Sequence, residues 1–565
     1  MSSRTNGPDR AIRLLTLLAR AAQHTPSALG TVTAVIGEAP GRLLPVAVAV
    51  AHSGAGPIDR AVADAVRASE LSHAELVDLE QRIPYPTHAL VHTAAAVTGR
   101  LLDLPEDEPL THAKRLGDHG IRLSALGEWP AALAVDERAV AIVRGLFAED
   151  PEPHAAELAR HLSNLGVDLG RLGRHAEGLA VAREALDLVR GLAGEDFARH
   201  GHHLVDALRN LGVELSRETR WQEALAVDEE AVALARRLVA EQPEDHLARL
   251  ARSLMTAGVD LTSLGRWDEA LTVDEEAVAI LRELVADDPD RHEAELAQAL
   301  SHLGTDLHRL RRHEEALPAF AESVAIVRRL AAENPAAHDE DLPRGLVKLG
   351  SVLTELGRHE EALAADEEAL RLTRPLAGQD PERHEPDLAH VLVCLAGDLS
   401  RLERDAEAVV RDEEAVAISR LLVARAPEAH RPQLARALLG LGVRAHRLRR
   451  WDASLAADEE AVDLLRAADR ASPAHQPELA HALGNLAASL VSLERHEEAL
   501  AATREQVRRY RRLRDDWPGV FDAELAAAES ELRRRRARVG IEGPDPEIAA
   551  PRRPPATRPD PHQVG

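Results

Sequence analysis

The chain has 565 residues, a formal net charge of −26 at pH 7, aromatic side chains at only 2% of positions and a single cysteine. Its length exceeds what one hydrophobic core supports, so the chain is either several domains or an extended array. The negative charge argues against nucleic acid as a partner, because a phosphate backbone requires a concentrated positive surface; one cysteine excludes an intrachain disulfide framework or a multi-cysteine metal site.

Alanine, leucine, glutamate and arginine dominate the composition, and long β-branched runs are absent. These residues favour helix, so the sequence predicts an all-α protein. The only lysines are Lys114 and Lys348, and arginine supplies almost all of the positive charge. Together with the abundant alanine, this usage is typical of a bacterial genome with a high GC content.

The N-terminal 108 residues differ from the rest of the chain. Residues 1–8 are predicted to be disordered and residues 9–108 to be helical, with breaks at Pro45, Gly54, Gly56, Pro57, Pro84 and Pro86. We expect residues 9–108 to cap an array or to add degenerate helix pairs. No convincing signal peptide is present, and the longest apolar run, Leu43 to Ala51, is far shorter than the ~20 residues of a membrane-spanning helix. The prediction is a cytoplasmic protein without membrane insertion.

Residues 109–516 repeat with a period of 46 residues. A turn residue marks nine units, the last after an interval of 45: Trp129, His175, Trp221, Trp267, His313, His359, Asp405, Trp451 and His496. Each unit reads as a first helix, a short turn, a second helix and a connection in which a proline ends the second helix. The period predicts nine tandem helix pairs, with a long second helix providing most of the extra length over a ~34-residue repeat.

Small residues stand where the two helices of a unit would cross, for example at Gly258, Gly265, Ala270 and Ala277, with Leu261 between them. Their relative spacing resembles that of tetratricopeptide repeat proteins, and the longer unit is similar to kinesin-light-chain-type arrays. The resemblance implies an α-solenoid, in which about nine antiparallel helix pairs form a right-handed superhelix with helical caps at both ends. Residues 517–540 are then a C-terminal capping helix, and the Pro-rich residues 541–565 are a disordered tail.

An aspartate interrupts the apolar face of several second helices. On a helical wheel, Asp274 falls near the middle of the arc formed by Ala270, Leu271, Ala277, Val278, Leu281 and Leu284. Six units hold aspartate at this position: Asp136, Asp228, Asp274, Asp366, Asp412 and Asp458. An active site is normally assembled once, so six copies indicate a structural role.

Two placements stay open for these six aspartates, because unpaired dry carboxylates would cost too much stability. In the first, each carboxylate reaches a cation one turn into the next first helix, as from Asp228 to Arg252 and from Asp412 to Arg436. In the second, the aspartates lie at the exposed edge of a groove, in contact with water.

Candidate catalytic and metal-binding residues have structural explanations. The connections carry one histidine each: His154, His200, His246, His292, His338, His384, His430 and His475. Packed helices lie ~8–10 Å apart, whereas zinc requires ligand nitrogens at ~2.0–2.1 Å, so we expect these histidines to pack or cap at repeat junctions. Cys394 lacks a catalytic His and acid set, and no phosphate loop, HExxH or GxSxG motif occurs. We expect no catalytic residue, no metal and no cofactor.

The polar face of the first helices is the predicted binding surface. The resemblance implies that this face lines a concave groove that holds an extended peptide. Equivalent positions in consecutive units hold Asn164, Asn210, Thr256, His302 and Lys348, with Val213 and Val259 beside them, and the same face carries Arg160, Arg252, Arg344 and Arg436. Ordinary polarity of a solvated helix surface is the alternative interpretation.

The charges are divided between the two kinds of helix. Most Asp-Glu-Glu triplets lie on second helices, whereas the first helices also carry Arg171, Arg209, Arg217, Arg309, Arg401 and Arg447. If first helices line the groove, it is basic inside and attracts an acidic peptide or a C-terminal carboxylate, unless neighbouring acids such as Asp168, Glu214, Asp260 and Asp306 pair with these arginines.

The sequence therefore predicts a noncatalytic scaffold that binds a protein or peptide partner, with an acidic peptide as candidate ligand. The alternative is a regulatory accessory subunit of an enzyme or signalling system that senses a small ligand. A compact pocket in residues 9–108 would favour the accessory subunit, and a continuous open groove would favour the scaffold.

Overall fold

The computed structural model describes residues 6–24, 28–52, 58–83, 90–105, 108–333, 338, 340–471, 475–516 and 521–541. These residues form 25 helices and no strand, which confirms the all-α prediction. The chain divides into two compact units, Met1–Val352 and Leu353–Gly565. The predicted breaks at Gly54, Gly56, Pro57, Pro84 and Pro86 lie outside the described residues, as do residues 1–5 and, apart from Ile541, the predicted tail.

The first unit contains the helices α1 (Asn6–His24), α2 (Ala28–Gly37), α3 (Pro40–His52), α4 (Asp59–Ala68), α5 (His73–Arg82), α6 (Val91–Leu102), α7 (Pro109–Ala125), α8 (Trp129–Glu149), α9 (Pro151–Arg171), α10 (His175–Glu195), α11 (Phe197–Arg217), α12 (Trp221–Glu241), α13 (Pro243–Ser263), α14 (Trp267–Asp287), α15 (Pro289–Arg309) and α16 (His313–Glu333). Helix α18 (Asp341–Glu355) runs across the boundary at residue 352. The second unit contains α19 (His359–Gln379), α20 (Pro381–Arg401), α21 (Asp405–Arg425), α22 (Pro427–Arg447), α23 (Trp451–Ala471), α24 (Gln476–Ser492), α25 (His496–Asp516) and α26 (Asp522–Arg538).

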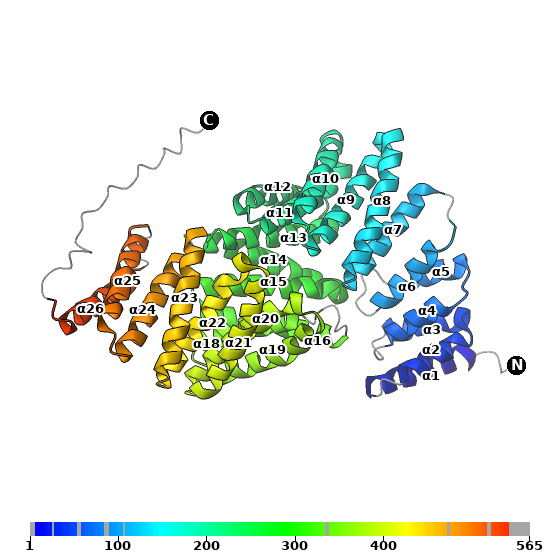
Figure 1. Cartoon of the computed structure of the whole chain (residues 1–565). Helices are drawn as coiled ribbons and strands as arrows, with labels where there is room; N and C mark the ends of the chain where they lie inside the picture. Colours follow the sequence, from blue (N-terminus) through cyan, green and yellow to red (C-terminus); the bar gives the residue numbers. More distant parts are fainter. Residues whose placement is uncertain are drawn as a thin grey trace. The chain divides into compact units, whose positions relative to one another are not determined.

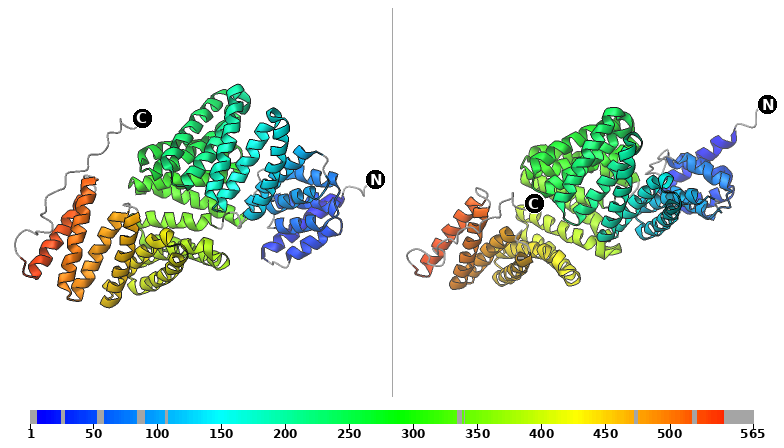
Figure 2. Two further views of the ribbon diagram at one scale, coloured as in Figure 1. Left: turned by 45° about the horizontal axis from the view of Figure 1, so that its top comes forward. Right: turned by 90° about the horizontal axis from the view of Figure 1, so that it is seen from above.

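Eight of the nine predicted helix pairs pack together, from α7 with α8 to α15 with α16 and from α20 with α21 to α24 with α25. Helices α18 and α19 occupy the positions along the chain of the remaining predicted pair. From α7 to α16 and from α19 to α26, each helix packs against the next one in the chain (Figures 1 and 2). First helices of neighbouring repeats also contact one another: α9 contacts α11, α11 contacts α13, and α20 contacts α22. This arrangement confirms the helix-pair solenoid, while the right-handed superhelix stays a prediction.

In six of the nine repeats the two helices are equally long, as α9, α10, α11 and α12 are at 21 residues each. Helices α7, α18 and α24 are shorter than the second helices that follow them. The expectation that the second helix provides most of the extra length was wrong for the six repeats with equal helices. The apolar pattern of the first helix begins soon after the connecting proline, so the first helix uses the added residues as fully as the second.

Proline and left-handed residues set the helix ends. Proline occupies the first turn of most first helices, as Pro151 does in α9. A backbone N–H at this position makes no hydrogen bond within the helix, so proline, which lacks the N–H, costs no hydrogen bond there. After the first helix the backbone turns through a left-handed residue, which is glycine at Gly127, Gly173, Gly265 and Gly357, with φ of 73–75°. Five equivalent turns use other residues with φ of 57–60°: Thr219, Arg311, Glu403, Arg449 and Glu494. The turn geometry is therefore kept even where its sequence favours it less.

The helical wheel of α14 predicted its buried face. Ala270, Ala277 and Leu281 are fully buried, and Val278 is nearly so. Asp274 lies among them with an exposed fraction of 0%. The aspartate is thus a core residue of the repeat.

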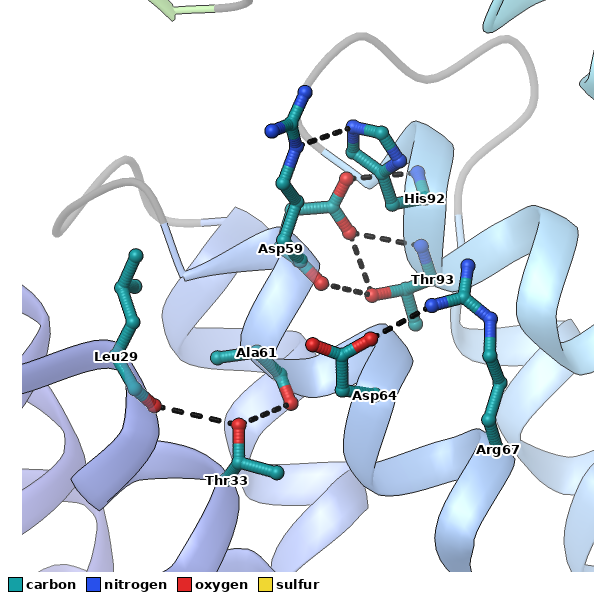
Figure 3. A network of polar contacts seen from close by, with 9 residues as sticks. Leu29, Thr33, Asp59, Ala61, Asp64, Arg67, His92 and Thr93 are labelled. Carbon is teal, nitrogen blue, oxygen red and sulfur yellow. Dashed lines mark hydrogen bonds and ion pairs between the residues drawn. The ribbon is translucent and has the colours of Figure 1, made fainter. Parts of the chain in front are cut away.

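Helices α1 to α6 have a core of their own, which includes Leu15, Ile36, Leu44 and Leu76. Asp59 at the start of α4 connects α4 to the start of α6 through hydrogen bonds (Figure 3). Its carboxylate accepts the backbone N–H of His92 at 2.8 Å and that of Thr93 at 2.9 Å, and the Thr93 hydroxyl at 2.6 Å. Asp59 therefore caps α6 from another helix, since Leu90 provides no side-chain cap. Burial raises the pKa of Asp59, and the hydrogen bonds from Thr93 and His92 oppose that rise.

Helix α26 packs against α25 at the other end of the second unit. Leu525, Ala528 and Leu532 of α26 meet Tyr510 and Leu513 of α25 in one cluster. Among the described residues, no helix is long and apolar enough to cross a bilayer.

Candidate functional site

Four first helices of the first unit, α9, α11, α13 and α15, share a cavity of about 580 Å³. Each of them contacts the next, so side chains on the same face of successive repeats come together. The lining includes six of the predicted residues: Asn210, Val213, Arg252, Thr256, Val259 and His302. A volume of this size is typical of ligand pockets.

The other five predicted residues are not part of the cavity lining. Asn164 lies on α9, and its amide nitrogen is buried without a hydrogen-bond partner. Lys348 on α18 donates to the Ser301 hydroxyl at 2.7 Å. The remaining three are arginines with acidic neighbours on the same or the next first helix: Arg160 with Glu157, Arg344 with Glu340 and Arg436 with Glu478. Arg436 belongs to the second unit, whereas the cavity lies in the first.

Two arginines give the cavity its polar character. The Arg209 guanidinium donates to the Asn210 side-chain oxygen at 2.9 Å, and Arg252 pairs with Glu295 at 3.3 Å. The Nε atoms of Arg209 and Arg252 are buried and have no hydrogen-bond partner. The Oε2 atom of Glu295 is also buried without a hydrogen-bond partner. Buried donors without partners are costly, so the two Nε groups offer a place for an acceptor.

The cavity combines positive charge with apolar surface. The lining holds four arginines, Arg171, Arg209, Arg217 and Arg252, and two acids, Glu214 and Glu295. Outside the lining, Asp206 and Asp228 also act on Arg209. Val167 and Val259 are 42% and 37% exposed, whereas Met255 lies deeper. The site can therefore accept a negatively charged group that carries an aliphatic neighbour.

His302 adds no positive charge at neutral pH. Burial lowers its pKa to about 4, and the nearby Lys348 contributes to the shift. Burial also lowers the pKa of Lys348, with Arg344 adding to the effect. The imidazole is thus a neutral hydrogen-bonding group at the end of the cavity.

The second helices are not purely acidic. Their arginines pair with a glutamate one repeat further on, 40 residues along the chain, which in four of six cases is the last residue of an Asp-Glu-Glu triplet. The pairs are Arg144–Glu184, Arg190–Glu230, Arg236–Glu276, Arg282–Glu322, Arg374–Glu414 and Arg420–Glu460. The side chains of these pairs are about one third to one half exposed, so each contributes little stability.

The six core aspartates are buried, with exposed fractions of 0–2%. The groove-edge placement was therefore wrong. The pairing from Asp228 to Arg252 was also wrong, because both oxygens of Asp228 lack a donor and Arg252 pairs with Glu295. Asp412 does have a cation, but it is Arg444 instead of Arg436. The cation sits two turns beyond the predicted one.

Four of the aspartates face a second buried aspartate on the next first helix, 32 residues along the chain. In the pairs Asp136–Asp168, Asp228–Asp260, Asp274–Asp306 and Asp366–Asp398, the two carboxyl groups lie close enough to share a hydrogen bond once one of them is protonated. Burial and the facing carboxyl raise the pKa of Asp136 and Asp228 to about 8 and that of Asp366 to about 9. Burial and Asp306 raise the pKa of Asp274 well above its usual value.

The second member of each pair also accepts a hydroxyl from the preceding first helix. Ser216 donates to Asp260 at 2.5 Å, Thr262 to Asp306 at 2.5 Å and Thr354 to Asp398 at 2.6 Å, and Ser124 donates to Asp168. Burial raises the pKa of these second aspartates too, to about 6 for Asp260, while the hydroxyl opposes the rise. Each site thus joins three consecutive helices.

Other junctions keep the contact by different means. Arg444 replaces the second aspartate opposite Asp412, and Ser489 donates to Asp458 at 2.6 Å. Phe320 and Val352 hold the two positions as buried apolar residues. Where Ala182 replaces the first aspartate, the second is Glu214, and Gly170 in place of the hydroxyl leaves room for its longer side chain.

The remaining candidates show no catalytic arrangement. Burial, with Asp366 and Asp398 nearby, raises the pKa of Cys394 to about 12, which disfavours a nucleophilic thiolate. The connection histidines lie at the starts of first helices, where His292 contacts Glu295 at 3.6 Å. In the part of the chain that is described, no group of three or more His, Cys, Asp and Glu residues could hold a metal ion.

Sequence reasoning missed two kinds of residue. It named Asp168, Asp260 and Asp306 only as neighbours of arginines, although their constant offset of 32 residues from the first aspartates was visible. It also missed Met255, Glu295 and Gln298 in the cavity lining. The offset of 43 residues that separates Arg252 from Glu295 also separates Lys114 from Glu157 and Asp206 from Arg249, so the repeat carried this signal.

A family model described as Tetratricopeptide repeat matches the chain over residues 158–199, 204–247, 250–290, 296–335 and 346–384. No curated protein matches the sequence. Among solved structures, BtubC (BKLC) from P. vanneervenii is 20% identical, with 44% of this chain and 91% of that chain covered and a TM-score of 0.36. The apo form of RapI is 12% identical, with 70% and 97% covered and a TM-score of 0.45. A signal-transduction ATPase with a tetratricopeptide repeat sensor from Pyrococcus horikoshii is 12% identical, with 93% and 74% covered and a TM-score of 0.47.

Proposed function

Because five segments between residues 158 and 384 match the tetratricopeptide repeat model, we propose that the chain is a noncatalytic scaffold that binds a protein or peptide partner on its first helices. The observation that carries the proposal is the cavity shared by α9, α11, α13 and α15. Several first helices contribute to it, so a ligand there contacts consecutive repeats at once.

The ligand is a peptide segment with a carboxylate, either an acidic side chain or a C-terminus. Arg209 and Arg252 present buried Nε donors, and four arginines outnumber two glutamates in the lining. Arginine matches a carboxylate with two parallel hydrogen bonds. Val213, Val259 and Met255 provide the surface for a neighbouring aliphatic side chain.

The alternative, an accessory subunit that senses a small ligand, rests on a second cavity in the N-terminal helices. This cavity has about 220 Å³ and lies among Pro40, Leu44, Leu71 and Asp78. It is smaller than the ~300–1,000 Å³ typical of ligand pockets. The larger cavity on the first helices therefore favours the scaffold.

Binding of acidic and basic peptide libraries to the full chain tests the proposal. We expect selection of acidic peptides, with affinity that falls between ~0.05 and ~0.5 M salt because exposed charges are screened. The double variant Arg209→Gln, Arg252→Gln should bind about tenfold or more weakly, since hydrogen bonds to charged groups contribute ~1.5–3 kcal/mol.

Two charge-matched controls locate the site. Arg144→Gln with Arg190→Gln removes two exposed arginines from second helices, and Arg344→Gln with Arg436→Gln removes two first-helix arginines outside the cavity. Both should bind like the parent. Selection of basic peptides, or equal losses in all three double variants, would contradict the proposal.

A further inference from the structure

The two carboxyl groups of each aspartate pair cannot both be ionised. In the pair Asp274–Asp306 both side chains are fully buried. If both were ionised, Asp274 Oδ1 and Oδ2 and Asp306 Oδ2 would have no hydrogen-bond donor. Two like charges in contact away from water repel each other strongly, so the contact requires a proton.

The hydroxyl of the preceding helix indicates which aspartate keeps the proton. Asp306 accepts Thr262 at its Oδ1, and its Oδ2 is the oxygen left without a donor. Asp260 and Asp398 show the same division between Oδ1 and Oδ2. The second aspartate is thus the stabilised carboxylate, and the first aspartate is the acid that donates to it.

The charged groups around the pairs do not replace the proton. Arg160 faces Asp136, and Arg209 faces Asp228, but neither donates a hydrogen bond to it. Arg171 approaches Asp168. Arg401 and His359 approach Asp398, while the Cys394 thiol lies beside that pair. Thr256 is the further polar neighbour of Asp228, and only Asp306 acts electrostatically on Asp274.

We propose that each of the four pairs shares a single proton and that together they form a pH-responsive latch between consecutive repeats, closed while the proton is held and released when alkaline pH removes it. The latch is confined to four junctions. Asp412–Arg444, Asp458–Ser489 and the apolar Phe320 and Val352 close the equivalent junctions without a second carboxyl.

The raised pKa values set the sign of the pH dependence. An unfolded aspartate has a pKa near ~3.9, whereas burial and the facing carboxyl raise the pKa of Asp136 and Asp228 to about 8 and that of Asp366 to about 9, and raise the pKa of Asp274 as well. The stabilisation is therefore complete below the unfolded pKa and is lost as the pH rises through the folded pKa. His161 and His302, whose pKa values burial lowers to about 4, act in the opposite direction below pH ~6.5. The window above pH 7 isolates the aspartates from these histidines.

A proton inventory of the full chain tests the latch. At pH 7 unfolding should release about one proton per pair, so about four protons, besides part of a proton from Asp412, whose pKa burial raises to about 7. The release from the pairs should fall as the pH rises through 8 and 9, where the buried Cys394 thiol begins to release its own proton on unfolding. Infrared spectra of the folded chain at pH 7 should show protonated carboxylic acid, which should be absent after unfolding. Counting protons avoids any assumption that a repeat array unfolds in one step.

Asp274→Asn is the matched variant, because its amide can donate to Asp306 without a proton. It should release about one proton fewer at pH 7, lose part of the infrared signal and resist alkaline unfolding better than the parent. Asp366→Asn should do the same in the second unit. Asp412→Asn is the control with opposite sign: it leaves Arg444 without its carboxylate, so stability at pH 8 should fall. The latch is rejected if the folded parent shows no protonated carboxyl at pH 7, or if Asp274→Asn and Asp366→Asn release as many protons as the parent.

Discussion

Arg444 on α22 donates from Nη1 to both oxygens of Asp412 on α21, at 3.1 and 2.9 Å. The same guanidinium donates from Nε to the Ala396 carbonyl at 3.1 Å. Both side chains are almost completely buried, so the junction holds one ion pair where four other junctions hold two carboxyls. Since Phe320 and Val352 hold the equivalent positions as buried apolar residues, the repeat accepts an ion pair, two carboxyls or two apolar side chains at this point.

Removal of one partner should cost more than removal of both. Arg444→Met leaves the Asp412 carboxylate buried without a cation, which should lower the free energy of unfolding by ~3–5 kcal/mol at pH 8. The double variant Arg444→Met, Asp412→Leu removes both charges and should recover most of this loss. Denaturant unfolding of the full chain measures both. An equal loss in the single and double variants would show that packing of Arg444, and not its charge, stabilises the junction.

Glycine should increase the stability of the turns in which another residue now has a positive φ. Thr219 is β-branched and has φ of 59°, a conformation that costs L-residues about 1–2 kcal/mol. Thr219→Gly should therefore raise the free energy of unfolding by about 1 kcal/mol despite the greater freedom of glycine in the unfolded chain. Gly265→Thr makes the reverse change in an equivalent turn and should destabilise by a similar amount. Thermal unfolding midpoints of both variants check the sign, and a loss of stability in Thr219→Gly would refute the prediction.

Gly212 should not tolerate a methyl group. A Cβ there would overlap the Asp228 carboxyl, so Gly212→Ala should destabilise the array by ~1–3 kcal/mol through overpacking. Gly191 on the exposed side of α10 has open space around its missing Cβ. Gly191→Ala should instead stabilise by ~0.5–1 kcal/mol because alanine favours helix. Denaturant unfolding of both variants decides between a packing effect and a general response of the helices to alanine.

His302 should titrate far below a free histidine. Its pKa is lowered to about 4 by burial and by Lys348, so NMR should show a neutral ring at pH 6. Its stabilising contribution is present above pH ~6.5 and is lost as the pH falls toward the folded value. Lys348→Met removes the neighbouring cation and should raise the His302 midpoint. Arg190→Gln on a second helix is the control; a shift there as large as that in Lys348→Met would contradict a local cause.

The repeat and its buried face could be read from the sequence because both follow from periodicity. The interval of 46 residues fixed nine pairs, and the wheel of α14 placed Ala270, Ala277 and Leu281 in the core. The partner of Asp228 could not be read from a wheel, since a wheel gives the buried face of one helix and not the depth at which the next helix crosses it. Arg252 lies 24 residues on and Asp260 lies 32 residues on, and only the packing of α12 against α13 selects Asp260.

The candidate site was predicted in part for a similar reason. Asn210, Thr256 and His302 occupy equivalent positions on three successive first helices and line one cavity. Asn164 and Lys348 occupy the same position one repeat before and one repeat after, but they do not line it. Periodicity shows which residues share the polar face of successive first helices. The number of repeats that line one cavity depends instead on how far each helix pair is rotated relative to the next.

The junction positions restrict the order of the repeats. Excision of residues 229–274 would place Asp228 against Asp306, and Ser216 would take the place of Thr262 as hydroxyl donor. That shortened chain keeps a complete junction. Excision of residues 137–182, an equally long piece, would place Asp136 against Glu214 and remove Gly170, so Ser124 would occupy the space that the glutamate now uses. Some neighbouring repeats can thus be duplicated or lost without a new misfit, and others must keep their neighbours.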